Sequence, residues 1–106
     1  MRDILVCLVT CPSKEVGTRL ATLLVEGRLA ACVNVIDGVQ SVYHWQEQVV
    51  VDSEVQLVIK TTRAKLQQVQ AKVLENHPYE IPEFIALEPV TTERRYADWL
   101  LGSLAG

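Results

Sequence analysis

The sequence lacks the features that mark several large classes of protein. Its ten Lys and Arg residues are dispersed among 13 Asp and Glu residues, with a net charge of -3, so no basic stripe predicts a nucleic-acid partner. No apolar stretch approaches the roughly 20 residues that span a bilayer, so we expect no membrane partner. The sequence also contains no internal repeat, linker or low-complexity segment, and we expect one domain over residues 1–106.

Cysteine is scarce and unpaired, and familiar catalytic motifs are absent. The three cysteines, Cys7, Cys11 and Cys32, form no CxxC motif. The apolar run over residues 4–9 is too short for a signal peptide and lacks its cleavage pattern, so we expect free thiols in the reducing cytoplasm. There is no Gly-rich phosphate loop, nucleophile elbow or HExxH motif. We therefore predict no catalytic residue and no enzymatic activity.

The apolar pattern predicts strands and helices in the order βαββαβ, followed by a C-terminal helix. The strands are expected over residues 4–9, 31–45, 49–62 and 83–87. Helical spacing of apolar residues fills the intervals after the first and third strands. This order predicts an α+β, ferredoxin-like sandwich with a long central β-hairpin. Right-handed crossovers place the first and third strands at the centre of an antiparallel sheet, with two helices on one face.

Short polar residues predict where these elements begin and end. The candidate N-caps of the three helices are Ser13, Thr62, and either Thr91 or Thr92, because their hydroxyls can accept from free backbone N–H groups. Gly27 is expected to end the first helix in the left-handed conformation. His77–Pro78 is expected to stop the second helix, and Asp37–Gly38 to place a bulge in the second strand.

Two features predict that the chain does not act as a monomer. The hairpin arms are each about 14 residues long, whereas strands average about 5–6, so the distal end of the hairpin must overhang the sheet. That overhang carries apolar side chains between Val42 and Val51. The first strand is also apolar on both faces, although the helices can cover only one of them. A second copy of the chain would explain both features.

Five ordered segments resemble one known family, the CutA proteins of divalent-cation tolerance. They are Val9–Pro12, Leu29–Asn34, Ser41–Trp45, Ile59–Thr62 and His77–Glu83, and together they extend over nearly the whole chain. The resemblance implies a homotrimer of ferredoxin-like subunits, similar in architecture to the PII signalling proteins. It also implies binding of copper or another divalent cation.

Under this resemblance the candidate metal ligands are Cys11, Cys32, His77 and Glu80. Thiolates suit Cu(I), whereas imidazole and carboxylate suit Cu(II) or Zn(II). Cys11 lies just ahead of a helix, whose dipole would favour its thiolate form. Structural alternatives remain open: Cys32 as a small buried side chain, Cys11 as an unused thiol, and His77 as a cap bonding to free carbonyls of the second helix.

Two functions therefore follow from the sequence. The first is a trimeric cytoplasmic metal-binding protein that takes part in metal tolerance. The second is a PII-like signalling or assembly module that binds a small effector or a protein partner, with metal binding incidental. For the second function, Arg28, Glu54 and Lys60 are candidate residues of a polar cleft between subunits. The aromatic residues Tyr43, Trp45, Tyr96 and Trp99 are expected to pack rather than to form a ligand cage.

Overall fold

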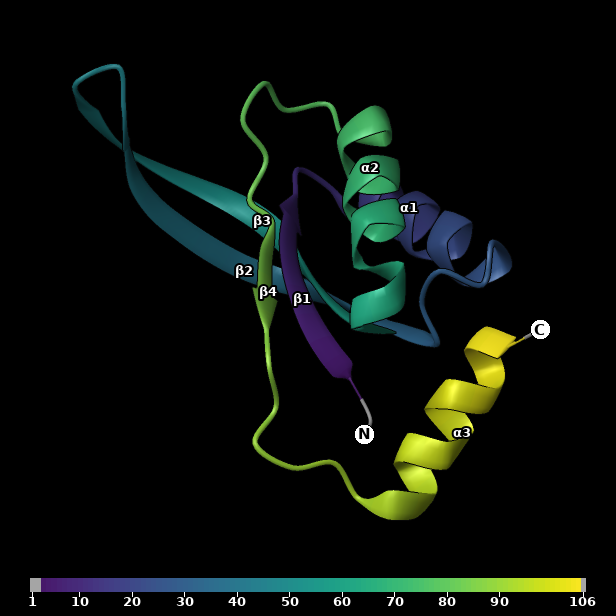
Figure 1. Cartoon of the computed structure of the whole chain (residues 1–106). Helices are drawn as coiled ribbons and strands as arrows, with labels where there is room; N and C mark the ends of the chain where they lie inside the picture. Colours follow the sequence, from purple (N-terminus) through teal and green to yellow (C-terminus); the bar gives the residue numbers. More distant parts are fainter. Residues whose placement is uncertain (1–2, 106) are drawn as a thin grey trace.

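The computed structural model describes residues 3–105 and contains the predicted elements in the predicted order. The strands are β1 (Ile4–Cys11), β2 (Cys32–Trp45), β3 (Gln48–Thr62) and β4 (Ile85–Leu87). The helices are α1 (Lys14–Glu26), α2 (Leu66–Asn76) and α3 (Arg94–Ala105), and a 3₁₀ turn, η1 (Arg63–Lys65), precedes α2. The α+β, ferredoxin-like arrangement with a C-terminal helix is therefore confirmed (Figure 1).

The four strands form one antiparallel sheet in the order β2-β3-β1-β4. β1 pairs with β3 without interruption, from Ile4 opposite Thr62 to Cys11 opposite Val55. As predicted, β1 and β3 are the central strands, and α1 and α2 lie together on one side of the sheet (Figure 1). β4 pairs with β1 over only three positions, so the fourth strand is shorter than expected.

The main core lies between this sheet face and the two helices. Side chains alternate across a strand, so Cys7 and Val9 of β1 point to the same side as their partners Ile59 and Leu57 of β3. All four are fully buried, as is the helical apolar stripe that packs on them. The helical residues of this core are Leu20, Leu24, Val69 and Val73. Cys7 is thus a core residue, as the sequence predicted.

The opposite sheet face is covered only at one end. Ile4 packs against α3 in a separate small core. Farther along the same face, Val6 and Leu8 of β1 are only partly buried, and their β4 partners Leu87 and Ile85 are about half exposed. The prediction that helices leave one apolar sheet face without cover is therefore confirmed for the described chain.

The β2–β3 hairpin projects well beyond the rest of the sheet (Figure 1), and the molecule is 45 Å long but only 27 Å by 23 Å across. The predicted bulge is present, because the β2–β3 register shifts between Ile36 and Val39. Gly38 adopts a positive φ of 75° there, which glycine tolerates without a Cβ clash. The shift changes which side chains of β2 point to the sheet face of Glu54. Even-numbered residues do so before the bulge, and odd-numbered residues do so beyond it.

Of the caps predicted for α1 and for the start of α2, one is confirmed and two need correction. Ser13 caps α1 as expected, its Oγ accepting from the Val16 N–H at 3.2 Å. Gly27 is the C-cap of α1 but has a φ of -81°. The left-handed residue is Arg28, with a φ of 58°, because it occupies the next position of a Schellman motif. Thr62 precedes η1 rather than α2 and makes no side-chain capping bond.

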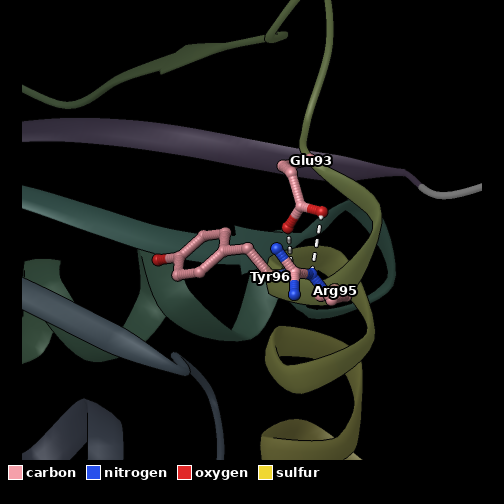
Figure 2. A network of polar contacts seen from close by, with 3 residues as sticks. All are labelled: Glu93, Arg95 and Tyr96. Atoms are coloured by element: carbon pink, nitrogen blue, oxygen red, sulfur yellow. Dashed lines mark hydrogen bonds and ion pairs between the residues drawn. The ribbon is translucent and has the colours of Figure 1, made fainter.

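The predicted start of α3 at Thr91 or Thr92 is wrong, because Glu93 takes that role. Its carboxylate accepts from the Tyr96 N–H at 3.0 Å, and its carbonyl accepts from the Ala97 N–H at 2.8 Å. Arg95 lies beside the same carboxylate, with Nε 3.4 Å from Oε2 (Figure 2). A carboxylate at a helix N-terminus also interacts favourably with the helix dipole.

Truncating the core residue Leu57 should test the packing of the main core. Leu57→Ala removes a fully buried side chain and should lower the free energy of unfolding by about 3 kcal/mol. Val90→Ala, at a fully exposed position, is the control and should change it by less than about 0.5 kcal/mol. Denaturant unfolding at matched protein concentration measures both, and equal effects would contradict this core.

Removing the α3 cap should produce a pH-dependent loss of stability. The Tyr96 and Arg95 backbone N–H groups lower the pKa of Glu93 from its ordinary value of 4.5. A group whose folded-state pKa is depressed stabilises the fold above its unfolded pKa and loses that effect as pH falls through the folded pKa. The melting temperature of Glu93→Ala should therefore fall below that of wild type above pH 4.5, and the gap should close in stronger acid.

Glu75→Ala, which removes an exposed carboxylate from α2, is the matched control for this capping effect. It should show no gap that closes over the same acid range. A gap for Glu93→Ala that stays constant down to the acid limit would mean that the charge of Glu93 does not stabilise α3.

Candidate functional site

A cavity of about 630 Å³ lies on the sheet face opposite α1 and α2 and extends along the projecting hairpin. The hairpin, the end of β1 and the loop between α2 and β4 form its walls. Its lining residues are Thr10, Ser41, Val42, Tyr43, Trp45, Glu54, Tyr79, Glu80, Ile81 and Glu83. This volume lies in the usual range for small-molecule sites, about 300–1,000 Å³.

The bulge in β2 determines which side chains of the hairpin reach this cavity. Because the register shifts at Asp37–Gly38, Ser41 and Tyr43 pair opposite Asp52 and Val50 and share the sheet face of Glu54. Without the extra residue, their neighbours on β2 would occupy that face. The predicted bulge is therefore the local feature that places the Tyr43 side chain on the cavity side of the sheet.

His77 holds the loop of residues 77–84 against the end of β1. Its ring Nε2 lies 2.7 Å from the Thr10 carbonyl oxygen, and its Nδ1 lies 3.1 Å from the Tyr79 backbone nitrogen. The carbonyl can only accept and the backbone N–H can only donate, so Nε2 carries the hydrogen and Nδ1 accepts. His77 is the C-cap residue of α2, but its ring bonds to β1 rather than to the carbonyls of α2. The alternative that the His77 ring bonds to free carbonyls of α2 is therefore wrong.

Two tyrosine–carboxylate pairs lie at the cavity. The Tyr79 hydroxyl donates to Glu54 Oε2 at 2.6 Å, and the Tyr43 hydroxyl donates to Asp52. Glu54 is only 8% exposed, and a carboxylate so buried requires hydrogen-bond donors to remain charged. Burial and the bond to Glu54 raise the pKa of Tyr79, and the bond to Asp52 raises that of Tyr43. Both phenols are therefore neutral donors at physiological pH.

The two predicted thiol ligands lie on opposite faces of the sheet. Cys11 belongs to the main core under the helices, whereas Cys32 pairs opposite Lys60, which pairs opposite Val6 on the other face. Five residues separate Val6 from Cys11, or about 16 Å along β1 at roughly 3.3 Å per residue. The two sulfurs of one subunit therefore cannot bind the same ion.

The expectation that Cys11 favours a thiolate is wrong. Desolvation raises the pKa of Cys11 to about 11, and the nearby negative charge of Glu54 adds to the effect. Burial likewise raises the pKa of Cys7 to about 11. Both residues are fully buried, so burial outweighs the helix dipole that the sequence suggested for Cys11.

Cys32 is the half-buried thiol, and it lies in a polar environment. Lys60 Nζ is 3.8 Å from Cys32 Sγ and also donates to Asn34 Oδ1. Lys60 lies six residues from Glu54 on β3, and Arg28 donates instead to the Ser103 carbonyl at 2.9 Å. The three residues predicted for a polar cleft therefore do not converge within one subunit.

The described residues of one subunit do not form a complete metal site. Over residues 3–105, no three His, Cys, Asp or Glu side chains lie close enough to hold a metal ion together. Glu80 lines the cavity, but both ring nitrogens of His77 are already engaged. The predicted ligand set, Cys11, Cys32, His77 and Glu80, therefore remains a prediction that requires donors from more than one subunit. Within the same range, no helix is both long and apolar enough to cross a bilayer.

These features define the class of the protein: a ferredoxin-like α+β fold with one apolar sheet face largely uncovered and an acidic, aromatic cavity along a long hairpin. The family model described as "CutA1 divalent ion tolerance protein" matches residues 5–103. The chain is 46% identical to the divalent-cation tolerance protein CutA of Thermus thermophilus, over 90% of this chain and 92% of that protein. The chain therefore belongs to the CutA family.

Two further relatives show how widely the sequence and the fold extend. The CutA1 crystal structure from Ehrlichia chaffeensis has a TM-score of 0.95 at 28% identity, over 100% of this chain and 99% of that one. The chloroplastic protein CutA of Arabidopsis thaliana is 42% identical over 93% of this chain but only 54% of its own length. The chain thus spans about half the length of that plant relative.

Sequence reasoning found most of the residues around the cavity but not their arrangement. It singled out Glu54 and Glu80 separately, and it expected Tyr43 and Trp45 to pack, whereas both are about 40% exposed in the subunit. The bond from Tyr79 to Glu54 spans 25 residues and has no periodic signal. The bulge at Asp37–Gly38 was the one local signal that could have placed the aromatic residues beside Glu54.

The two core thiols should resist alkylation in the folded protein. At pH 8 a thiol with a pKa of about 11 is almost entirely protonated, and burial also excludes the reagent. Maleimide labelling followed by peptide mass spectrometry should leave Cys7 and Cys11 unmodified without denaturant. Both should react in urea, which is the positive control. Rapid labelling of Cys11 in the native protein would show that the end of β1 opens readily.

Proposed function

We propose that this chain is a subunit of a cytoplasmic homotrimer that binds copper or another divalent cation and contributes to metal tolerance. The observation that carries the metal role is membership of the divalent-ion tolerance family over residues 5–103. The proposal treats the ion as bound by the assembled protein, because the described residues of a single subunit bring together no sufficient set of ligands.

The uncovered sheet face supports the assembly. Val6, Leu8, Ile85 and Leu87 form an apolar surface there. The overhanging hairpin exposes Val42, Val49 and Val51 on its other face, each more than half exposed. Apolar surface of this extent is stabilised by burial against a partner. A second and third copy of the chain would supply that cover, and sheet edges paired between subunits would also protect the hairpin from aggregation.

The candidate ligands differ in how readily a metal ion can reach them. Cys32 is half-buried, and Glu80 is exposed at the cavity. Cys11 would have to leave the core and lose its proton, and His77 would have to release the Tyr79 N–H to free a lone pair on Nδ1. We therefore propose Cys32 as the ligand for a soft ion such as Cu(I) and Glu80 as a ligand for a harder divalent ion.

A second candidate function is favoured by the cavity itself. Its volume of about 630 Å³ and its mixed aromatic and carboxylate lining suit a small molecule better than a single metal ion. Under this alternative the trimer is a PII-like signalling or assembly module that responds to a small effector or binds a protein partner, and metal binding is incidental. Because shared architecture does not determine function, the cavity carries this alternative rather than the fold.

Metal titration of the assembled protein tests the first proposal. Competition assays with Cu(I) and Cu(II) should show saturable binding by wild type and at least about tenfold weaker Cu(I) binding by Cys32→Ser. Glu80→Gln should weaken Cu(II) binding, whereas Glu75→Gln, at an exposed carboxylate of α2 outside the cavity, should leave both ions unaffected.

Light scattering on the same samples should give the mass of three 11.9 kDa chains for wild type and every variant. A monomeric mass would contradict the assembly. Wild-type binding no stronger than buffer background would contradict the metal role and leave the effector-binding alternative.

A further inference from the structure

The bulge in β2 leaves two residues of that strand, Asp37 and Gly38, without partners in the β2–β3 register. The register shifts between Ile36 and Val39, so both bulge residues lie opposite Val55 of β3. Val55 points to the helix side of the sheet, where it is buried beside α1. The bulge therefore lies outside the sheet face that we assign to contacts between copies of the chain.

The backbone at the bulge brings a carboxyl group against the next main-chain nitrogen. The Gly38 N–H donates to Asp37 Oδ1 at 2.8 Å, and both residues are exposed. Among the described residues, no heavy atom other than those of the chain neighbours lies within 4 Å of the point where a Gly38 side chain would begin. A carboxyl group beside an unhindered glycine nitrogen is the arrangement from which aspartate isomerises without an enzyme.

We propose that Asp37 is a modification site, at which the folded protein converts aspartate to isoaspartate spontaneously. The Gly38 nitrogen attacks Cγ of the protonated Asp37 side chain, and one carboxyl oxygen leaves as water with the acid proton and the amide proton. This step closes a cyclic succinimide. Water then adds to the main-chain carbonyl carbon of Asp37 and breaks its bond to the Gly38 nitrogen. One water is lost and one is regained, so the mass is unchanged.

The bulge permits this reaction in the folded state because the sheet does not oppose it there. Closing the ring requires the backbone at Asp37 to rotate, and within a regular ladder that rotation would break hydrogen bonds to the neighbouring strand. A bulge residue is already unpaired, and Gly38 tolerates a wide range of dihedral angles. The reaction consumes only water, so the proposal depends neither on metal binding nor on an open route for a ligand.

A second aspartate in the same hairpin provides an internal comparison. Asp52 also precedes a small residue, Ser53, a sequence that undergoes the same reaction in unfolded chains. Here, however, both residues are paired in register with β2, and the Tyr43 hydroxyl donates to the Asp52 carboxylate. The structure therefore distinguishes two sites that sequence alone would both flag: Asp37 should convert in the folded protein, and Asp52 should not.

Conversion at Asp37 would alter the hairpin itself. In isoaspartate the main chain runs through Cβ and Cγ, which lengthens it by one methylene, and the former main-chain carbonyl becomes a free carboxylate. The added atom falls at the bulge, where the pairing of β2 with β3 changes register. Ageing of the protein should therefore produce a fraction of chains in which the projecting part of the hairpin is displaced.

Incubation of the assembled protein at neutral pH and 37 °C tests this proposal. Peptide mapping with electron-transfer fragmentation distinguishes isoaspartate from aspartate at equal mass, and a parallel sample in urea gives the rate at each site in the unfolded chain. In the folded protein, conversion at Asp37 should stay within several-fold of its rate in urea. Conversion at Asp52 should be slowed at least about tenfold, because it requires opening of a paired strand.

The variant Asp37→Glu keeps the charge at this position but lengthens the side chain, so the succinimide cannot form. It should abolish modification at this position and leave conversion at Asp52 in urea unchanged, and light scattering should show that its assembly matches wild type. Equal slowing of Asp37 and Asp52 by folding would overturn the proposal, because the bulge would then be protected as well as the ladder. Conversion of both sites at their urea rates would also overturn it, since the reaction would then proceed through global unfolding.

Discussion

The unbroken antiparallel register between β1 and β3 is the constraint on which the rest of this structure depends. It aligns Cys7 and Val9 with Ile59 and Leu57 under the helices, where a continuous core can form. The same alternation forces Val6 and Leu8 to the other side. One apolar face is thereby buried within the subunit, and the other remains for contacts with another molecule. α1 and α2 pack together on one face, and α3 covers the other face only around Ile4.

The register also separates two cysteines, Cys11 and Cys32, that the sequence offered as ligands of one metal ion. Cys11 and Cys32 follow similar local patterns near helix ends, yet they lie on opposite faces and about 16 Å apart along the sheet. Cys11 becomes a core residue with an elevated pKa, whereas Cys32 is next to the ammonium group of Lys60. Any shared role for these thiols would have to arise between subunits. A ligand set chosen by residue type alone cannot detect that geometry.

The sequence predicted the elements of the fold well because hydrophobic periodicity extends over many residues. The order of the strands and the uncovered face follow from that signal, whereas the central position of β1 and β3 follows from the handedness of crossovers and the bulge from Asp37–Gly38. Helix ends were less predictable, because neighbouring residues compete for the same geometry. Glu93 caps α3 although two threonines precede it, and Arg28 adopts the left-handed conformation although Gly27 is adjacent.

The candidate site was predictable only in part, for a different physical reason. His77 and Glu54 were each singled out, but the bonds that they make join residues between 2 and 67 positions apart in the chain. Such contacts depend on how the loop of residues 77–84 docks on β1, which no local pattern encodes. The acidic character of the cavity follows from that docking as much as from composition, because the loop brings Glu80 and Glu83 to the wall that contains Glu54.

The bulge at Asp37–Gly38 has a consequence for how this hairpin can diverge. Because side chains alternate with a period of two, deleting one residue from the distal arm of β2 would exchange the faces of everything beyond it. Val42 and His44 would then turn toward Glu54, and Tyr43 and Trp45 would turn away. Deleting two residues would shorten the hairpin and preserve the faces. Insertions or deletions in this segment that keep Tyr43 and Trp45 on the face of Glu54 should therefore add or remove an even number of residues. Whether the length of the segment is even or odd thus determines the cavity wall independently of which residues it contains.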